Sequence, residues 1–379
     1  MLDVAIVGAG VAGASAAAAF SSSGLDVGVY ERRALPGDIN RGDALHAEAV
    51  EILRGWGAFP ALGGRGAFWV RRALLTTSQD HPRVRVHLDE PFLMLEHAGI
   101  ETALLETAAE RGVEVHQKAV RALEPDGAGW RLSTDHDEVR CRLVIGADGA
   151  KSVVRRAARI ESDGERYTEV SVVLHAPLPR WLPDDSSCAV FGPDGLVLIL
   201  PTTPPGMCRV VTQVALSQLP RWREASPREL RWLLGRRNPR LADLEVERRF
   251  GSHVYKLRWQ HARRYVRSGL ALIGDAAHIT HPNGGQGMAM AIHDAASLER
   301  VAVPVLQDAC NGRADLNAAL WEYAARRRQV NADALARADR MAKFTHGNRP
   351  AHVATMAALG LFSLAPSVFE KLMTTFGGE

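Results

Sequence analysis

The chain contains few cysteines. There are four among its 379 residues, Cys141, Cys188, Cys208 and Cys310, and they lie far apart in the sequence. Because none of them has the Cys-x-x-Cys or Cys/His spacing of a metal site, we expect neither a bound metal nor a disulfide scaffold. Unpaired thiols are typical of a reducing compartment, so the sequence predicts a cytoplasmic protein.

Charge of one sign and long apolar runs are also missing. The formal net charge is only +3 and the basic residues are scattered, so no nucleic-acid-binding surface is indicated. No apolar run reaches the roughly 20 residues of a transmembrane helix, and no basic leader precedes Asp3. The apolar segment 351–372 is expected to be a helix packed on the core, with peripheral membrane contact as the alternative. We expect a monomer or a homodimer.

The first feature that is present is a glycine-rich turn near the N-terminus. A predicted buried strand leads into GAGVAG at residues 8–13, and a helix of small residues follows. In such a turn Gly8 permits the tight bend, Gly10 lets a pyrophosphate approach the backbone, and Gly13 lets the helix pack on the strand. Glu31 ends the second predicted strand, where an acidic residue binds an adenosine ribose. The motif predicts a dinucleotide site and leaves NAD and FAD open.

A second glycine-rich turn, GADG at residues 146–149, follows another predicted buried strand and precedes Ser152 and Arg155. Two interpretations remain open from the residues alone. The turn is either part of a ligand site, or a simple turn in which the Asp148 side chain bonds to the backbone and caps the next helix.

The third motif is the stretch Gly274–Asp294, which begins with Gly274-Asp275 after the apolar run 270–273. A stretch rich in glycine then leads into a long apolar helix. The N–H groups of the first helical turn and the helix dipole favour an anionic ligand at this point. The carboxylate of Asp275, beside a buried strand, needs a hydroxyl or N–H partner, and a ribityl chain would supply hydroxyls.

Alternating predicted strands and helices indicate an α/β fold in two parts. Residues 1–161 and 270–345 are predicted to form a discontinuous, doubly wound Rossmann-like (GR2-type) domain that binds the cofactor. In residues 162–269, strand-like segments are separated by Pro and Gly clusters, which predicts an inserted antiparallel-sheet lobe for the substrate. Residues 346–379 are predicted to be a C-terminal helical segment.

The three motifs, in this order and spacing, resemble the single-component (group A) FAD-dependent aromatic monooxygenases with the para-hydroxybenzoate hydroxylase fold. The resemblance covers essentially the whole chain, and RGDALH at residues 41–46 is similar to the subgroup of ubiquinone-pathway and quinolone hydroxylases. It implies that the 8–13 turn holds the ADP half of FAD, that Asp275 lies at the ribityl chain and that Pro282 lies beside the flavin ring. The cofactor-binding residues implied in this way are Gly8, Gly10, Val11, Ala12, Gly13, Glu31, Arg32, Arg41, Val120, Asp148, Gly149, Arg155, Gly274, Asp275, Pro282, Gly284, Gly285, Gln286, Gly287 and Met288.

Two positions depart from the family's pattern. His97 stands roughly where the family often has Arg, which weakens the transfer of a cofactor role to it, and Ala289 stands where the family often has Asn, which removes one hydrogen bond to the flavin. His278 and His281 flank the predicted flavin loop. We expect both to be structural side chains rather than catalytic ones.

The resemblance implies an enzyme that uses FAD, NAD(P)H and O2. The nicotinamide reduces the flavin, which forms a C4a-hydroperoxide with O2 and hydroxylates an electron-rich carbon, so no catalytic side chain is assigned. The apolar composition of the predicted lobe indicates a small apolar aromatic substrate such as a phenol, quinolone, quinone precursor or polyketide-like molecule of secondary metabolism. The alternatives are an epoxidase or a flavin-dependent reductase on the same fold, or a flavin-binding protein without turnover.

Overall fold

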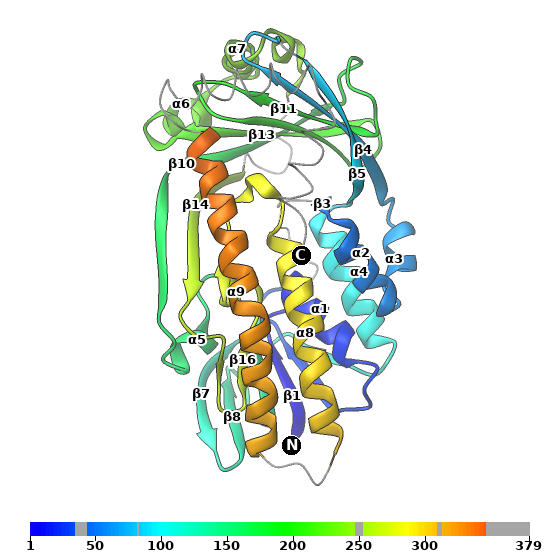
Figure 1. Ribbon diagram of the computed structural model, residues 1–379, viewed down its shortest axis with the longest axis vertical. Helices are drawn as coiled ribbons and strands as arrows, with labels where there is room; N and C mark the ends of the chain where they lie inside the picture. Colours follow the sequence, from blue (N-terminus) through cyan, green and yellow to red (C-terminus); the bar gives the residue numbers. More distant parts are fainter. Residues whose placement is uncertain (35–43, 82, 247–252, 309–312, 346–379) are drawn as a thin grey trace. The chain divides into compact units, whose positions relative to one another are not determined.

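The computed structural model describes residues 1–34, 44–81, 83–246, 253–308 and 313–345. Arg41 and the segment 346–379 lie outside the described residues. The chain forms two compact units (Figure 1). The first comprises residues 1–65, 96–165 and 259–336, and the second comprises residues 66–95, 166–258 and, among those described, 337–345.

The first unit contains the glycine-rich motifs. Its elements are β1 (Leu2–Val7), α1 (Val11–Phe20), β2 (Val27–Tyr30), β3 (Ala44–Leu45), α2 (Ala47–Gly55), α3 (Phe59–Gly63), α4 (His97–Ala109), β6 (Glu114–His116), β7 (Val120–Asp126), β8 (Gly129–Thr134), β9 (Glu138–Gly146), α5 (Val153–Ala157), β15 (Val266–Arg267), β16 (Leu270–Leu272), η3 (Gly274–Ala276), β17 (His278–Ile279), η4 (Pro282–Gly284) and α8 (Gly287–Gln307).

A parallel sheet forms the centre of this unit. β16, β9, β1, β2 and β6 lie side by side in that order, and each pairs with its neighbour in parallel. Short, continuous apolar runs such as β1 and β16 are typical of strands buried on both faces. α1 packs against α4 and α8, which run beside it in Figure 1. The α/β fold predicted from the sequence is thus confirmed.

A second sheet forms the other unit. Its strands follow the order β14-β10-β13-β12-β11-β4-β5 and are antiparallel wherever β10, β13, β12 and β11 meet. The exception is β11, which pairs with β4 in parallel. The elements are β4 (Phe68–Thr77), β5 (Val84–Met94), β10 (Ser162–Pro177), β11 (Ser186–Phe191), β12 (Val197–Thr202), β13 (Met207–Ala215), η1 (Leu216–Gln218), α6 (Leu219–Glu224), α7 (Pro227–Arg237), η2 (Pro239–Asp243) and β14 (His253–Ala262), followed later by α9 (Arg313–Thr345); β10, β14 and α9 contain residues of both units.

The core of the second unit lies on one face of its sheet. Alternate residues of β10, such as Val170 and Val172, pack with Leu230 and Leu234 of α7 in one buried cluster. The start of α7 is capped by Ser226, whose hydroxyl accepts a hydrogen bond from the backbone N–H of Glu229 at 3.3 Å. The helices of this unit therefore cover the apolar face of the sheet.

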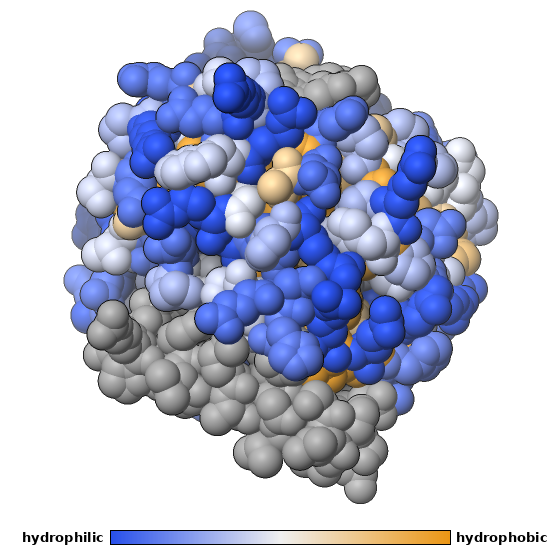
Figure 2. Space-filling view, turned by 90° about the horizontal axis from the view of Figure 1, so that it is seen from above, coloured by the Kyte–Doolittle hydropathy of each residue, from blue (hydrophilic) through white to orange (hydrophobic). Residues whose placement is uncertain are grey.

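The surface seen in Figure 2 is predominantly hydrophilic, and the hydrophobic residues visible there form small, separate areas. Trp232 is one of the large hydrophobic residues that are exposed. The guanidinium carbons of Arg221 and Arg236 lie 4.9 and 5.3 Å from its ring centroid, so two cations partner the exposed ring. Among the helices described, none is both long enough and apolar enough to cross a membrane.

Candidate cofactor site

The predicted motifs gather at one edge of the parallel sheet. Residues 8–13 follow β1, Glu31 follows β2, residues 146–149 end and follow β9, and Gly274 follows β16. Since these strands are parallel, their carboxyl ends lie at the same edge, which is where ligands bind in open α/β sheets. The structure thus brings together motifs that are separated by more than 100 residues of sequence.

The first turn depends on its glycines. Gly8 has a φ of +101°, and a Cβ added there would lie 2.5 Å from the carbonyl oxygen of Ala147. A Cβ added to Gly13 would lie only 1.8 Å from the carbonyl oxygen of Gly8. These close approaches seat α1 on β1 and place the first turn directly against the second motif.

α1 begins at this turn with no capping side chain. Gly10 is the residue before the helix, and no side chain of the described residues bonds to the first-turn amides there. The N–H groups of Val11, Ala12 and Gly13 are the ones that an α-helix leaves without intrahelical partners. A diphosphate fits such a helix start, because the amides can donate to it and the helix dipole favours its charge.

Glu31 is buried at the end of β2. One carboxylate oxygen accepts the backbone N–H of Ala9 at 2.8 Å. The other accepts the N–H and the Nε of Arg33 at 2.9 and 3.1 Å. Burial opposes ionisation, but these hydrogen bonds outweigh it and lower the pKa of Glu31. The first turn is therefore tied to an ionised carboxylate that is suited to accept ribose hydroxyls.

The two oxygens of Asp148 agree with the two interpretations of the second motif, a helix cap and a ligand site. Its Oδ2 accepts the backbone N–H groups of Val153 and Val154 at 2.5 and 3.2 Å, so the carboxylate caps α5. Its Oδ1 is buried and has no hydrogen-bond partner among the described residues. Burial is the main cause that raises the pKa of Asp148. A buried acceptor without a partner is costly, so a ligand that donates a hydroxyl fits this oxygen.

Arg155 connects the second motif to the third. Its side chain is buried, and its guanidinium donates to the carbonyl oxygen of Ala276 at 2.6 Å and to that of Ala150 at 3.0 Å. With the side-chain amide of Gln260 turned so that its oxygen faces Arg155, both terminal nitrogens of Arg155 also donate to it at 3.1 Å. Ala276 belongs to the turn that carries Asp275, so Arg155 fixes the distance between the two turns.

The third motif packs closely on α1. Gly274 has a φ of +55°, and a Cβ added there would lie 2.6 Å from the Cβ of Ala12. Asp275 is half-buried between buried neighbours. Pro282 lies in η4, and Gly285 has a φ of +61° just before α8 begins. α8 has 21 residues, and no side chain of the described residues caps its start. The positive end of the helix dipole points at this loop.

The structure also describes Val120 and Arg32, two other predicted cofactor residues. Val120 is buried at the start of β7, opposite Thr134, and Arg32 is exposed directly after Glu31. The structural role expected for His278 is confirmed, since its buried ring bonds to Asp294. The assignment of the remaining residues to the cofactor stays a prediction. The sequence assigned no role to Glu101, whose side chain lies beside the first turn, or to the side chain of Asp294, which is discussed below.

We expect the free energy of unfolding to fall as the pH is lowered from about 6.5 to about 4. Burial is the main cause that lowers the pKa of His261 and His293 to about 4, with Arg328 and Arg327 as the next largest causes. In the unfolded chain both rings protonate near pH 6.5. The unfolded state therefore binds more protons in this window, so the stability falls from about pH 6.5 and the loss is complete near the folded values of about 4.

Denaturant unfolding at several pH values between 7.5 and 4 checks this expectation. The double variant His261→Gln/His293→Gln should show a flatter dependence between about pH 6.5 and 4. A slope equal to that of the parent protein would show that other groups control the acid sensitivity.

The described residues offer no metal site, because no group of three or more His, Cys, Asp or Glu side chains among them is arranged to hold an ion. Three cysteines lie in the described part of the chain, and all three are buried and unpaired. By contrast, the helix starts, the carboxylate of Glu31 and the unpartnered oxygen of Asp148 fit the diphosphate and hydroxyl groups of FAD.

Comparison with known proteins agrees with this site. Residues 1–338 match the family described as FAD binding domain. The chain is 30% identical over 329 residues to the 3-demethoxyubiquinol 3-hydroxylase of Escherichia coli, and the match covers 79% of each chain. It is 36% identical over 249 residues to the ubiquinone hydroxylase UbiL of Rhodospirillum rubrum, over 62% of this chain and about half of that one, 53%.

The fold also matches a solved structure. The p-nitrophenol 4-monooxygenase PnpA of Pseudomonas putida superposes with a TM-score of 0.83, and the match covers 100% of this chain and 98% of that one. The sequence identity is 21%, so this likeness concerns the fold alone.

Proposed function

Because this chain belongs to the FAD-binding-domain family and is an FAD-dependent monooxygenase, we propose that it hydroxylates a small apolar aromatic substrate with NAD(P)H as the electron donor. When bound, FAD accepts the hydride and activates O2. The chain's own residues bind and orient the cofactor, exclude water and hold the substrate. The observation that carries the proposal is that three motif turns meet at one sheet edge, around acceptors and amides that suit FAD.

The residue roles that we propose follow from the donors and acceptors present. The amides at the start of α1 would hold the diphosphate, and Glu31 would accept ribose hydroxyls. Asp148, through its unpartnered oxygen, and Asp275 would accept hydroxyls of the ribityl chain. The amides at the start of α8 would face the ring edge that gains negative charge on reduction, with Pro282 beside the ring.

The relatives support the substrate class that we propose. The Escherichia coli relative is named for the hydroxylation of a ubiquinol precursor, and the Rhodospirillum rubrum relative for ubiquinone hydroxylation. Both names point to an apolar ring that carries oxygen substituents. We therefore propose a quinone precursor or a phenol, quinolone or polyketide-like ring of similar chemistry, acted on in the cytoplasm by a monomer or a homodimer.

Oxidation of NAD(P)H by the purified protein tests the proposal. The protein should be yellow with bound FAD, and a panel of apolar phenols and quinone precursors should contain at least one compound that accelerates NAD(P)H oxidation at least tenfold. With isotopically labelled O2, the product of that compound should carry one labelled oxygen. A product that gains two hydrogens and no oxygen would instead establish a reductase, and a panel without any accelerating compound would refute the aromatic substrate class.

A further inference from the structure

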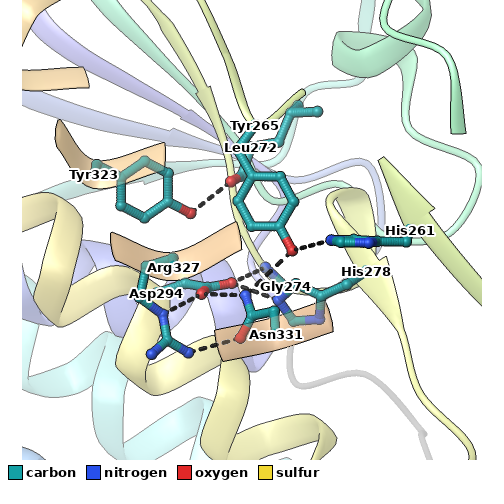
Figure 3. A network of polar contacts seen from close by, with 9 residues as sticks. All are labelled: His261, Tyr265, Leu272, Gly274, His278, Asp294, Tyr323, Arg327 and Asn331. Atoms are coloured by element: carbon teal, nitrogen blue, oxygen red, sulfur yellow. Dashed lines mark hydrogen bonds and ion pairs between the residues drawn. The ribbon is translucent and has the colours of Figure 1, made fainter. Parts of the chain in front are cut away.

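The side chain of Asp294 lies at the centre of a buried polar network in the first unit (Figure 3). It belongs to α8 and is fully buried. Oδ2 accepts the backbone N–H of Gly274 at 3.1 Å and lies 2.6 Å from Nε2 of His278. Oδ1 accepts the Nε of Arg327 and the Nδ2 of Asn331, both at 2.9 Å. One carboxylate thus joins four hydrogen-bonding partners.

These partners come from separate parts of the fold. Gly274 starts the turn that carries Asp275, His278 lies in β17 just after that turn, and Arg327 and Asn331 lie on α9. A further contact holds the strand before the turn, since the hydroxyl of Tyr323 donates to the carbonyl oxygen of Leu272 at 2.8 Å. α9 therefore bonds directly to the strand before the turn and reaches the turn itself through Asp294.

The network also fixes the orientation of the carboxylate itself. The side-chain oxygen of Asn331 accepts a hydrogen bond from Arg327 at 2.8 Å, which sets both donors against Oδ1. Nδ2 of Asn331 also donates to the hydroxyl of Tyr265 at 3.3 Å, and that hydroxyl lies 3.0 Å from Nε2 of His261. Tyr265 and His261 form an outer arm that does not touch Asp294.

A buried carboxylate is costly unless it is paired and fully hydrogen-bonded. Here burial opposes ionisation, but His278 and Arg327 outweigh it and lower the pKa of Asp294. The ionised carboxylate can accept from all its neighbours at once. Donors face both oxygens of Asp294. An Asn side chain at the same place has only one acceptor oxygen, so its NH2 group would face two donors.

We propose that Asp294 is a positioning residue for FAD. By holding the N–H of Gly274 and the ring of His278 against α9, it sets the position of Asp275 and of the loop that leads to the start of α8. It lies at the far end of the third motif, 19 residues after Asp275. The position of the turn depends on the negative charge of Asp294, not only on the shape of its side chain.

FAD affinity of the apoprotein tests this role separately from the substrate chemistry. Titration of FAD, followed by quenching of its fluorescence, should give a dissociation constant at least 30-fold higher for Asp294→Asn than for the parent. Asn331→Ala removes one of the four partners and should raise it 3- to 10-fold. Tyr265→Phe breaks only the outer arm and should stay within twofold, which makes it the matched control.

A second measurement separates positioning from general support of the fold. At one fixed FAD concentration, FAD should raise the Tm of the parent by more than it raises the Tm of Asp294→Asn or Asn331→Ala, because the stabilisation grows with the logarithm of the ligand concentration divided by the dissociation constant. If both variants lower the Tm of the apoprotein but keep the FAD affinity within twofold, the proposal is wrong and the network is only a structural support. If Asp294→Asn does not fold, Asn331→Ala decides the question alone.

Discussion

Gly13→Ala is expected to abolish FAD retention. The added methyl carbon would lie 1.8 Å from the carbonyl oxygen of Gly8, well inside the distance at which two atoms can coexist. The obstacle is backbone rather than a flexible side chain, so relief requires α1 to move away from β1. Such overpacking typically costs about 1–3 kcal/mol and more where the backbone must shift. The movement would also displace the helix start at which the diphosphate is expected.

The bound FAD per protein after purification, read from the flavin absorbance, checks this expectation. We expect less than about one-tenth of the parent's content, together with a lower Tm. Gly55→Ala is the matched control, because a Cβ there meets nothing within 4 Å and the position lies in α2. That control should retain FAD fully and gain up to about 1 kcal/mol of stability, since Ala favours helix over Gly. Normal FAD content in Gly13→Ala would show that the turn adapts.

The sheet edge and its turns could be predicted because their signals are local. Continuous apolar runs such as 270–273 mark buried parallel strands, and glycines mark the points where the chain must turn or approach closely. The positive φ values of Gly8 and Gly274 agree with this logic. The sequence leaves two interpretations of Asp148 open, as a helix cap or as part of a ligand site, because a carboxylate has two oxygens. Here one oxygen caps α5, while the other has no partner among the described residues.

Long-range pairing could not be predicted in the same way. The alternation of residues 68–77 predicts a strand, but nothing in these residues indicates that Arg72 lies opposite Ser186 in a parallel pair. Strand pairing depends on partners far along the chain, so the local pattern of one strand does not reveal which partner it takes. The helical spacing of apolar residues over 44–54 likewise predicts one helix, yet Ala44 and Leu45 form β3 and the helix begins at Ala47.

The importance of Asp294 was hidden for a related reason. A carboxylate inside an apolar helix pattern looks like an isolated exception, since its meaning depends on donors that other elements bring to it. Two of those donors, Arg327 and Asn331, lie on the following helix, where they read as ordinary solvated residues. The partners of the Asp294 carboxylate become visible only in the structure, where α8 lies against α9 and against the turn that begins at Gly274.

Arg155→Met is expected to raise the dissociation constant of FAD at least 30-fold and to destabilise the fold by about 2–4 kcal/mol. Methionine fills much of the same volume but donates no hydrogen bond. The buried carbonyl oxygen of Ala276 then loses the 2.6 Å bond that joins the two motif turns, and an unsatisfied buried acceptor costs about 1–3 kcal/mol. The carbonyl oxygen of Ala150 and the amide of Gln260 lose their donor as well.

Arg156→Met provides the matched control on the same short helix. Arg156 is exposed, and the hydrogen bond described for it is to the carbonyl oxygen of Lys151, not to the turn that carries Asp275. Because exposed hydrogen bonds are exchanged for bonds to water, this variant should keep the FAD affinity within twofold and the free energy of unfolding within about 0.5 kcal/mol. FAD titration and denaturant unfolding of the two variants, side by side, measure both quantities. Equal behaviour of Arg155→Met and Arg156→Met would show that Arg155 does not hold the second and third motifs together, and the cofactor site would then depend on Glu31, Asp148 and the two helix starts alone.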